Sequence, residues 1–298
     1  MNIIELSRKF SKPEKAVKYF ESVRWKDGVI CPYCQSDKTC KHHAQGKKRW
    51  QCWGCHKSFS VTVGTIFHHS HIPLNKWFLL MALMLNAKKG LSAYQAARDL
   101  GMNRPTVWSM MHRIRKAMGT DQAQLLRDIV EMDETYIGGT PRKSNDKDDD
   151  DKPSSPRGRG TKKTPVVGMI ERGGNVKTVA TSKFELKGKD LKKLVRKHVD
   201  LEETILVTDE YKGYLGMSGL LAHLSVNHQK TYVDGDVHTN TIESFWAILK
   251  RGIIGQFHKV SKQYLQNYLH EFEYRYNRRN ADNCVTFEHL LGRACYGR

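Results

Sequence analysis

Two pairs of closely spaced cysteines constrain what this chain can fold into more than any other feature of its sequence. Cys31 and Cys34 form the first pair, Cys52 and Cys55 form the second, and 17 residues separate the pairs. Each C-x2-C turn can direct two thiolates toward one point, and four thiolates complete the tetrahedral shell of a closed zinc site. Such a shell leaves no open position for catalysis. We therefore expect structural Zn2+ in a small β-rich zinc ribbon; the alternative is four unrelated buried cysteines.

The charge of the chain indicates a polyanionic partner. Lys and Arg outnumber Asp and Glu by 50 to 31, which gives a formal charge of +19 over 298 residues. The basic residues are spread along most of the chain, a pattern that favours nucleic acid. No apolar run approaches the roughly 18 to 20 residues that span a bilayer, and the N-terminus carries charges where a signal peptide would be apolar. We expect a cytoplasmic protein with no membrane partner.

The segment after the cysteines has the pattern of two helices joined by a glycine turn. One apolar series runs from Ala93 to Leu100, Gly101 interrupts it, and a second series extends from Asn103 to Met118. This order is typical of a helix-turn-helix, whose second helix enters the major groove of DNA. The alternative for these helices is a plain helical spacer. For the zinc ribbon, the alternative to nucleic-acid contact is a protein-docking role. The residues expected to contact DNA in this half are Arg49, Arg104, Thr106, Arg113 and Arg115.

The second half of the chain alternates between short apolar runs and helical stretches, which is typical of an α/β domain. Residues 140–164 interrupt it with a polar insert that contains almost no apolar residues, so we expect a flexible surface loop there. The expected elements are a hairpin of Val166–Ile170 and Lys177–Ala180, a helix near Lys187–His198, a strand at Ile205–Val207, and helices at Ile242–Arg251 and Lys262–Arg278.

Three acidic residues in this half suggest chemistry on a phosphodiester. Asp133 ends the apolar run 129–132, Asp209 ends the run 205–208, and Glu243 lies at the start of a helix that carries Lys250 two turns later. Carboxylates that hold two Mg2+ ions can activate a nucleophile and stabilise the leaving oxygen. Alternatively, the aspartates cap the next elements and Asn240 forms an ordinary capping box with Glu243.

Other polar residues near these acids leave the assignment open. Glu131, Glu134 and Glu210 flank the two aspartates and are alternative ligands. His238 and Asn240 are two residues apart, so in an extended segment they would point toward the same site. His238 could orient a water molecule or a DNA end, or it could be a structural histidine.

Four motifs carry a family resemblance. They are Met132-Asp-Glu-Thr-Tyr-Ile-Gly-Gly139, Thr208-Asp-Glu-Tyr-Lys-Gly-Tyr214, the segment His238 to Gly252 that contains Glu243 and Lys250, and Tyr274-Arg-Tyr-Asn-Arg-Arg279. Together they resemble the small bacterial insertion-sequence transposases that carry an N-terminal zinc ribbon, relatives of the eukaryotic Merlin elements. The resemblance covers most of the chain and is weakest in the insert.

The resemblance implies a ribonuclease-H-like catalytic fold in which Asp133, Asp209 and Glu243 are the DDE ligands of Mg2+ or Mn2+ and Lys250 lies near DNA phosphates. It also implies double-stranded DNA as partner, both at terminal inverted repeats and at the target, and a homo-oligomer on paired ends near the bacterial nucleoid. The third acidic position of this group is sometimes described as Asn, which keeps Asn240 as an alternative. A carboxylate binds a hard cation better than an amide does, which favours Glu243.

These expectations combine into a multidomain α/β protein with a zinc ribbon at 1–72, a helix-turn-helix domain at 73–122 and a catalytic domain at 123–298. Its expected activity is metal-dependent DNA cleavage and strand transfer. The alternatives are a non-catalytic DNA-binding regulator or captured transposon remnant, and a nuclease without strand transfer. The residues expected at the catalytic centre are Asp133, Asp209, Glu243, Lys250, His238 and Asn240. Further DNA contacts are expected at Lys250, Arg251, Arg275 and Arg278.

Overall fold

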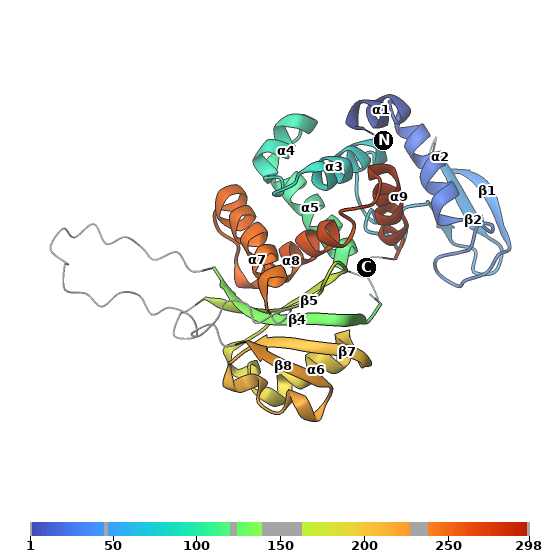
Figure 1. Ribbon diagram of the computed structural model, residues 1–298. Coiled ribbons are helices and arrows are strands. Elements are labelled where there is room, and N and C mark those ends of the chain that lie inside the picture. Colours follow the sequence, from blue (N-terminus) through green and yellow to red (C-terminus); the bar gives the residue numbers. More distant parts are fainter. Residues whose placement is uncertain (1, 45–46, 120–123, 139–162, 227–237, 297–298) are drawn as a thin grey trace, which may run out of the picture. The chain divides into compact units, whose positions relative to one another are not determined.

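The chain forms two compact units. The computed structural model describes residues 2–44, 47–119, 124–138, 163–226 and 238–296 (Figure 1). The first unit comprises Met1–Asp121 and Asn280–Arg298, and the second comprises Gln122–Arg279. Almost all of the expected flexible insert lies outside the described residues. No helix within the described ranges is both long and apolar enough to cross a membrane.

The first unit contains the expected small β structure around the cysteines. Strands β1 (Thr39–Ala44), β2 (Lys47–Cys52) and β3 (Ser58–Phe59) form an antiparallel sheet in that order. Its core is small, because Cys31, Cys52 and Phe59 are the fully buried members of the cluster.

Two helices precede this sheet, whereas the sequence analysis predicts a β-rich zinc ribbon from residue 1. Helix α1 (Ile3–Lys9) begins with a capping box between Asn2 and Glu5, and α2 (Pro13–Arg24) begins with proline in its first turn. Both are standard signals for the start of a helix. The expectation was wrong for this segment because it gave weight to the cysteines and aromatics that follow.

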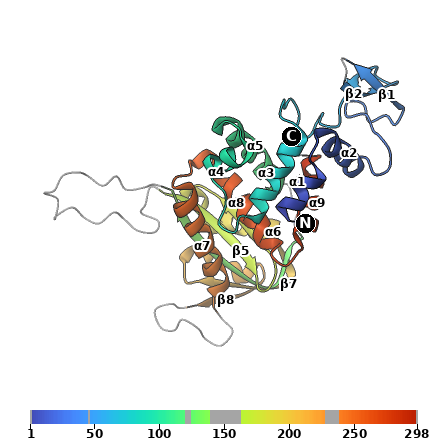
Figure 2. The same cartoon turned by 90° about the horizontal axis from the view of Figure 1, so that it is seen from above.

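The remaining helices of the first unit are α3 (Leu74–Asn86), α4 (Ala93–Leu100), α5 (Arg104–Gly119) and α9 (Asn283–Ala294). Gly101 ends α4, as expected, and the structure shows it in a left-handed conformation with φ 59°. Helix α9 lies beside α3 in both views and also contacts α5 (Figure 2). The rings of Phe78 and Phe287 meet edge to face at 5.7 Å. The C-terminal helix therefore belongs to the first unit, although the expected catalytic domain extended to residue 298.

The second unit is built on a five-stranded sheet in the order β6-β5-β4-β7-β8. Its strands are β4 (Leu126–Ile137), β5 (Thr164–Glu171), β6 (Val176–Ala180), β7 (Val199–Asp209) and β8 (Ala222–Val226). Strand β5 is antiparallel to both β4 and β6, which confirms the expected hairpin, whereas β4, β7 and β8 are parallel neighbours.

Helices cover both faces of this sheet (Figure 1). Helix α7 (Asn240–Gly252), a π-helical turn (Ile253–Phe257) and α8 (Lys262–Asn277) share a core with apolar residues of β5 and β6. Helix α6 (Gly188–His198) packs on the opposite face against a second core. This layered arrangement is the expected α/β architecture.

Candidate catalytic site and zinc centre

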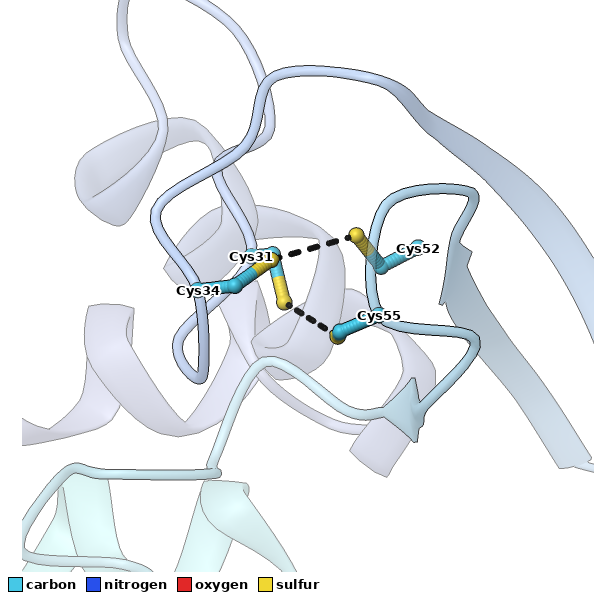
Figure 3. Close-up of side chains that lie close together, drawn as sticks. All are labelled: Cys31, Cys34, Cys52 and Cys55. Atoms are coloured by element: carbon cyan, nitrogen blue, oxygen red, sulfur yellow. Dashed lines mark hydrogen bonds between the residues drawn. The ribbon is translucent and has the colours of Figure 1, made fainter.

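The four cysteines of the first unit converge on one point (Figure 3). All four sulfur atoms lie within 4.8 Å of one another; Cys31 Sγ is 3.7 Å from Cys55 Sγ, and Cys34 Sγ is 3.5 Å from Cys52 Sγ. Zinc–thiolate bonds of about 2.3 Å place the corners of a tetrahedron roughly 3.8 Å apart. The cysteines are free of disulfides. This geometry fits the expected structural zinc site.

Two residues near the zinc centre have roles inside the ribbon. Arg49 donates from Nε to Ser58 Oγ at 2.8 Å and from Nη2 to the Ser58 carbonyl at 3.1 Å, which braces β2 against β3. Trp50 donates from Nε1 to Glu21 at 3.0 Å. Trp53, by contrast, is 61% exposed. The outward aromatic group of the second cysteine turn is therefore Trp53.

Helix α5 exposes only some of the side chains expected on DNA. Asn103 Oδ1 accepts from the Thr106 backbone N–H at 3.0 Å and so caps the helix, and Arg104 beside it is exposed. Arg113 donates to the His68 carbonyl at 2.6 Å. Arg115 is 1% exposed, which corrects the expectation that it contacts DNA, because its guanidinium lies in the interior of the unit.

In the second unit, two of the expected acids lie on neighbouring parallel strands. Met132 of β4 is registered with Thr208 of β7, so Asp133 and Asp209 follow side by side on one face of the sheet. Asp209 ends β7 as expected. Asp133 does not end β4: the strand continues to Ile137, and Asp133 is paired with Gly168 of β5. That difference arises because antiparallel pairing with β5 continues after the parallel pairing with β7 stops.

Helix α7 is held directly against Asp133. Trp246 Nε1 donates to Asp133 Oδ2 at 3.0 Å, and Trp246 lies three residues after Glu243, on the same side of the helix. The indole packs on Gly168, where an added Cβ would lie 2.5 Å from the Trp246 ring. The absence of a side chain at Gly168 therefore allows α7 to approach the acids.

The environment of Asp133 disfavours its charge. Burial, together with the nearby charges of Glu134 and Asp209, raises the pKa of the Asp133 carboxyl to about 7, although the hydrogen bond from Trp246 acts in the opposite direction. Clustered carboxylates raise one another's pKa values, and a bound cation reverses that effect. The donor set thus fits a divalent metal ion.

Substituting Gly168 tests how closely α7 must approach the sheet. We expect Gly168→Ala to lower the free energy of unfolding of the second unit by about 1 to 3 kcal/mol, because the new methyl group overlaps the Trp246 indole. Chemical denaturation followed by Trp246 fluorescence measures this, since Trp246 is the only tryptophan of this unit. Gly219→Ala is the matched control, because a Cβ there meets nothing within 4 Å. Equal stability of the two variants would contradict the expectation.

The start of α7 presents the third acid. Glu243 is exposed, and its Oε1 accepts from Thr239 Oγ1 at 3.2 Å. The helix begins at Asn240 with Thr239 as its N-cap, so the alternative capping box between Asn240 and Glu243 does not form. Lys250 is exposed in the last turn of α7, two turns after Glu243.

Among the described residues, the four cysteines are the only group of three or more His, Cys, Asp or Glu side chains that are placed to hold one metal ion. Asp133, Asp209 and Glu243 are not such a group in this structure. Carboxylates that surround a pair of ions about 3.5 to 4 Å apart need not all touch one another.

Two of the three flanking acids have internal partners. Glu134 accepts from Tyr214 Oη at 2.7 Å, and Glu131 is fully buried and hydrogen-bonded to the start of α7. Glu210 is exposed. His238 is half-buried, with Nδ1 3.1 Å from Arg172 Nη2. Sequence analysis missed Arg172, because no local pattern connects it with these residues.

The basic residues expected on DNA in this unit differ in their surroundings. Arg275 is largely buried and pairs with Glu271 at 2.8 Å, whereas Arg278 stacks on Tyr274 at 5.3 Å. Lys250 and Arg251 are exposed. Lys250 lines a cavity of about 400 Å³ that sequence analysis did not anticipate. Its other polar or charged lining residues are Tyr136, Lys163, His258 and Lys259.

With this geometry established, comparisons with known proteins assign the chain to a family. The profile of the ISXO2-like transposase domain matches residues 125–277, just over half of the chain. The chain belongs to the ISXO2-like DDE transposase family. The profile of a transposase zinc-ribbon domain matches residues 12–58, in agreement with the cysteine geometry of this transposase.

The ISXO2-like transposase has a relative in another transposable element. It is 28% identical over 274 residues to an uncharacterized protein in transposable element ISH50 of Halobacterium salinarum, a match that covers 89% of this chain and 91% of the relative. Similar solved structures include the Mos1 strand transfer complex, with a TM-score of 0.30, 11% identity and coverage of 74% of this chain and 78% of that one. Another is the Mos1 transposase paired-end complex with the left transposon end, with a TM-score of 0.25, 13% identity and coverage of 69% and 78%. At these TM-scores the structural similarity carries no argument.

Proposed function

We propose that this transposase cleaves DNA at the terminal inverted repeats of its insertion sequence and joins the freed 3′-hydroxyl groups to target DNA. The observation that carries the proposal is the position of Asp133 and Asp209 directly after the last registered pair of two adjacent parallel strands, with the helix of Glu243 docked over Asp133 by Trp246. Ligand sites of open α/β sheets lie at the carboxyl ends of their strands.

The three acids would hold the catalytic cations. Asp133 Oδ2 accepts from Trp246, the Asp133 carboxyl also accepts from the Glu134 backbone N–H, and Asp209 Oδ1 accepts from the Tyr211 backbone N–H at 3.0 Å. A carboxylate has about four lone-pair sites, so both keep lone pairs for a metal. Carboxylate oxygens suit Mg2+ and Mn2+. When bound, two such ions supply charge neutralisation at phosphorus and at the attacking and leaving oxygens. Glu243 is the proposed third ligand, with Asn240 as the alternative.

The cavity beside Lys250 offers a path for the DNA strand. Three lysines and a histidine line it, and within the described part of the chain no acidic residue is among its lining residues. The cavity is lined by Tyr136 of β4, the strand that carries Asp133, and by Lys250 of α7, the helix that carries Glu243. We propose that Lys250, Lys259 and Lys163 contact phosphates next to the cleaved bond, which would make binding depend on salt.

The first unit would recognise the transposon ends. Helices α4 and α5 would act as a helix-turn-helix, with exposed Arg104 and Ser109 near the start of α5 toward the major groove. The zinc ribbon would add basic contacts. We also propose a ribonuclease-H-like core for the second unit, a homo-oligomer on paired ends and a location near the nucleoid, all from the family resemblance.

The test is an assay with DNA that carries the terminal repeats of the element. With Mg2+ or Mn2+, the protein should nick the repeat ends and produce joined products with target DNA, and EDTA should abolish both. Specific binding without metal-dependent breakage would instead support a non-catalytic regulator. Breakage without joined products would support a nuclease.

A further inference from the structure

A buried carboxylate of β4 accepts hydrogen bonds from the start of α7 and from Arg172. Glu131 is 0% exposed, and its Oε2 accepts from the Ile242 backbone N–H at 2.9 Å. Its Oε1 accepts from Thr241 Oγ1 at 2.9 Å and from Arg172 Nε at 2.7 Å. Burying a carboxylate is unfavourable unless it is paired and hydrogen-bonded, as this one is. Glu131 therefore has a defined structural partner, the first turn of α7.

Helix α7 depends on this contact because the side chain of its N-cap residue, Thr239, accepts no hydrogen bond from the first backbone N–H groups of the helix. The Thr239 side chain makes no capping hydrogen bond, and it donates to Glu243 instead. The first backbone N–H groups of any helix lack partners within the helix. A carboxylate at that end is favoured by hydrogen bonding and by the helix dipole. Glu131 provides this cap from a strand that lies 111 residues earlier in the chain.

Arg172 attaches His238, which lies just before α7, to strand β4. Its backbone N–H donates to the Ile129 carbonyl at 3.0 Å, which anchors Arg172 to β4. Its Nη2 donates to the His238 carbonyl at 2.8 Å, and its Nε pairs with Glu131. The residues just before α7 and its first turn are therefore both tied to β4.

We propose that Glu131 is a positioning residue of the transposase, which acts with Arg172 to set where Glu243 lies relative to Asp133. Glu131 and Asp133 are two residues apart on β4 and share one face of the sheet. Ile242, which Glu131 binds, immediately precedes Glu243. The inference rests on the proposed function, in which Asp133 and Glu243 hold the catalytic cations. Both oxygens of Glu131 accept hydrogen bonds from within the protein, and His238 Nδ1 lies 3.4 Å from its Oε1.

The test removes both charges of the pair together. Glu131→Met alone would remove the carboxylate that pairs with the half-buried Arg172, whereas Glu131→Met with Arg172→Met replaces the ion pair by apolar groups, a change that proteins often tolerate without loss of stability. Glu131→Gln keeps an acceptor for Ile242. Lys177→Met with Glu273→Met is the matched control, because it removes another largely buried ion pair of this unit, with a separation of 2.7 Å.

We expect the Glu131/Arg172 double variant to keep its unfolding midpoint while the amides of Ile242 and Glu243 exchange at least ten-fold faster. Mn2+ binding, measured by electron paramagnetic resonance, should weaken at least ten-fold. Single-turnover cleavage should fall at least thirty-fold, while DNA affinity should change by no more than two-fold. Glu131→Gln should have a cleavage rate and Mn2+ affinity between those of the double variant and the unaltered protein. The Lys177/Glu273 control should change none of the α7 exchange, Mn2+ affinity or cleavage by more than two-fold.

The proposal is overturned if the folded double variant retains the Mn2+ affinity and Ile242 exchange of the unaltered protein. It is also overturned if that variant cleaves within two-fold of the unaltered protein. Failure of the proposed function looks different, because the unaltered protein would then cleave no DNA with any metal. In that case amide exchange and Mn2+ binding still decide whether Glu131 positions α7.

Discussion

Replacement of Asp133 by Asn is expected to lower metal-dependent DNA cleavage at least about 1,000-fold, a loss of roughly 4 kcal/mol in transition-state stabilisation. The amide has nearly the shape of the carboxylate and keeps an oxygen that can accept from Trp246, so α7 should stay in place. It loses the negative charge that holds a hard divalent cation. Single-turnover cleavage of end-labelled repeat DNA measures the effect, and DNA affinity should change by no more than about two-fold.

The companion variants identify the other ligands. Asp209→Asn and Glu243→Gln should show losses similar to that of Asp133→Asn. Glu202→Gln is the control, because Glu202 is exposed on β7 far from its Asp209 end. A large loss in Asn240→Ala with little loss in Glu243→Gln would make Asn240 the third ligand. Full cleavage by the variant that carries all three acid substitutions would rule out this catalytic site.

Removal of zinc is expected to unfold the ribbon of the first unit. Its sheet has only three strands, and the fully buried members of its cluster include two of the cysteines. So small a core rarely folds without a metal or disulfides. Structural zinc contributes apparent binding free energies of about 10 to 16 kcal/mol to small zinc domains. After treatment with a strong chelator, the amides of β1 and β2 should exchange at rates close to those of an unfolded chain.

Cysteine substitutions separate zinc loss from other effects of the chelator. Cys34→Ser with Cys55→Ser should bind no stoichiometric zinc and should show the same loss of protection in β1 and β2. Cys40→Ser is the control, since Cys40 lies on β1 outside the four-sulfur set. The strands of the second unit should keep their protection in both variants. A protected ribbon in the zinc-free protein would contradict the assignment of a structural zinc site.

Features set by short-range patterns could be predicted from the sequence. The spacing of the cysteine pairs identified a set of four thiols that the structure brings together. Alternation and turn glycines predicted the β5–β6 hairpin, and helical periodicity predicted α6, α7 and α8. These predictions succeeded because ligand spacing and side-chain periodicity act over a few neighbouring residues.

The alternation of side chains along β4 could also place Glu131 and Asp133 on one face, but it could not distinguish their roles. Both are acids on the same strand, and each finds its partner more than 100 residues later, in Ile242 and Trp246. The same limit applies to Gly168. A side chain is excluded there by the Trp246 ring, which comes from a distant part of the chain.

The sequence by itself indicated the four cysteines of the zinc site, most helices and strands of the second half other than β8 and α9, and a short set of candidate acids. Only the tertiary structure decided that Glu131 caps α7, that Trp246 binds Asp133, that Arg115 is buried, and that α9 packs in the first unit. The physical reason is the range of the interactions. Periodicity and ligand spacing are local, whereas burial and hydrogen-bond partners depend on which distant segments the folded chain brings together.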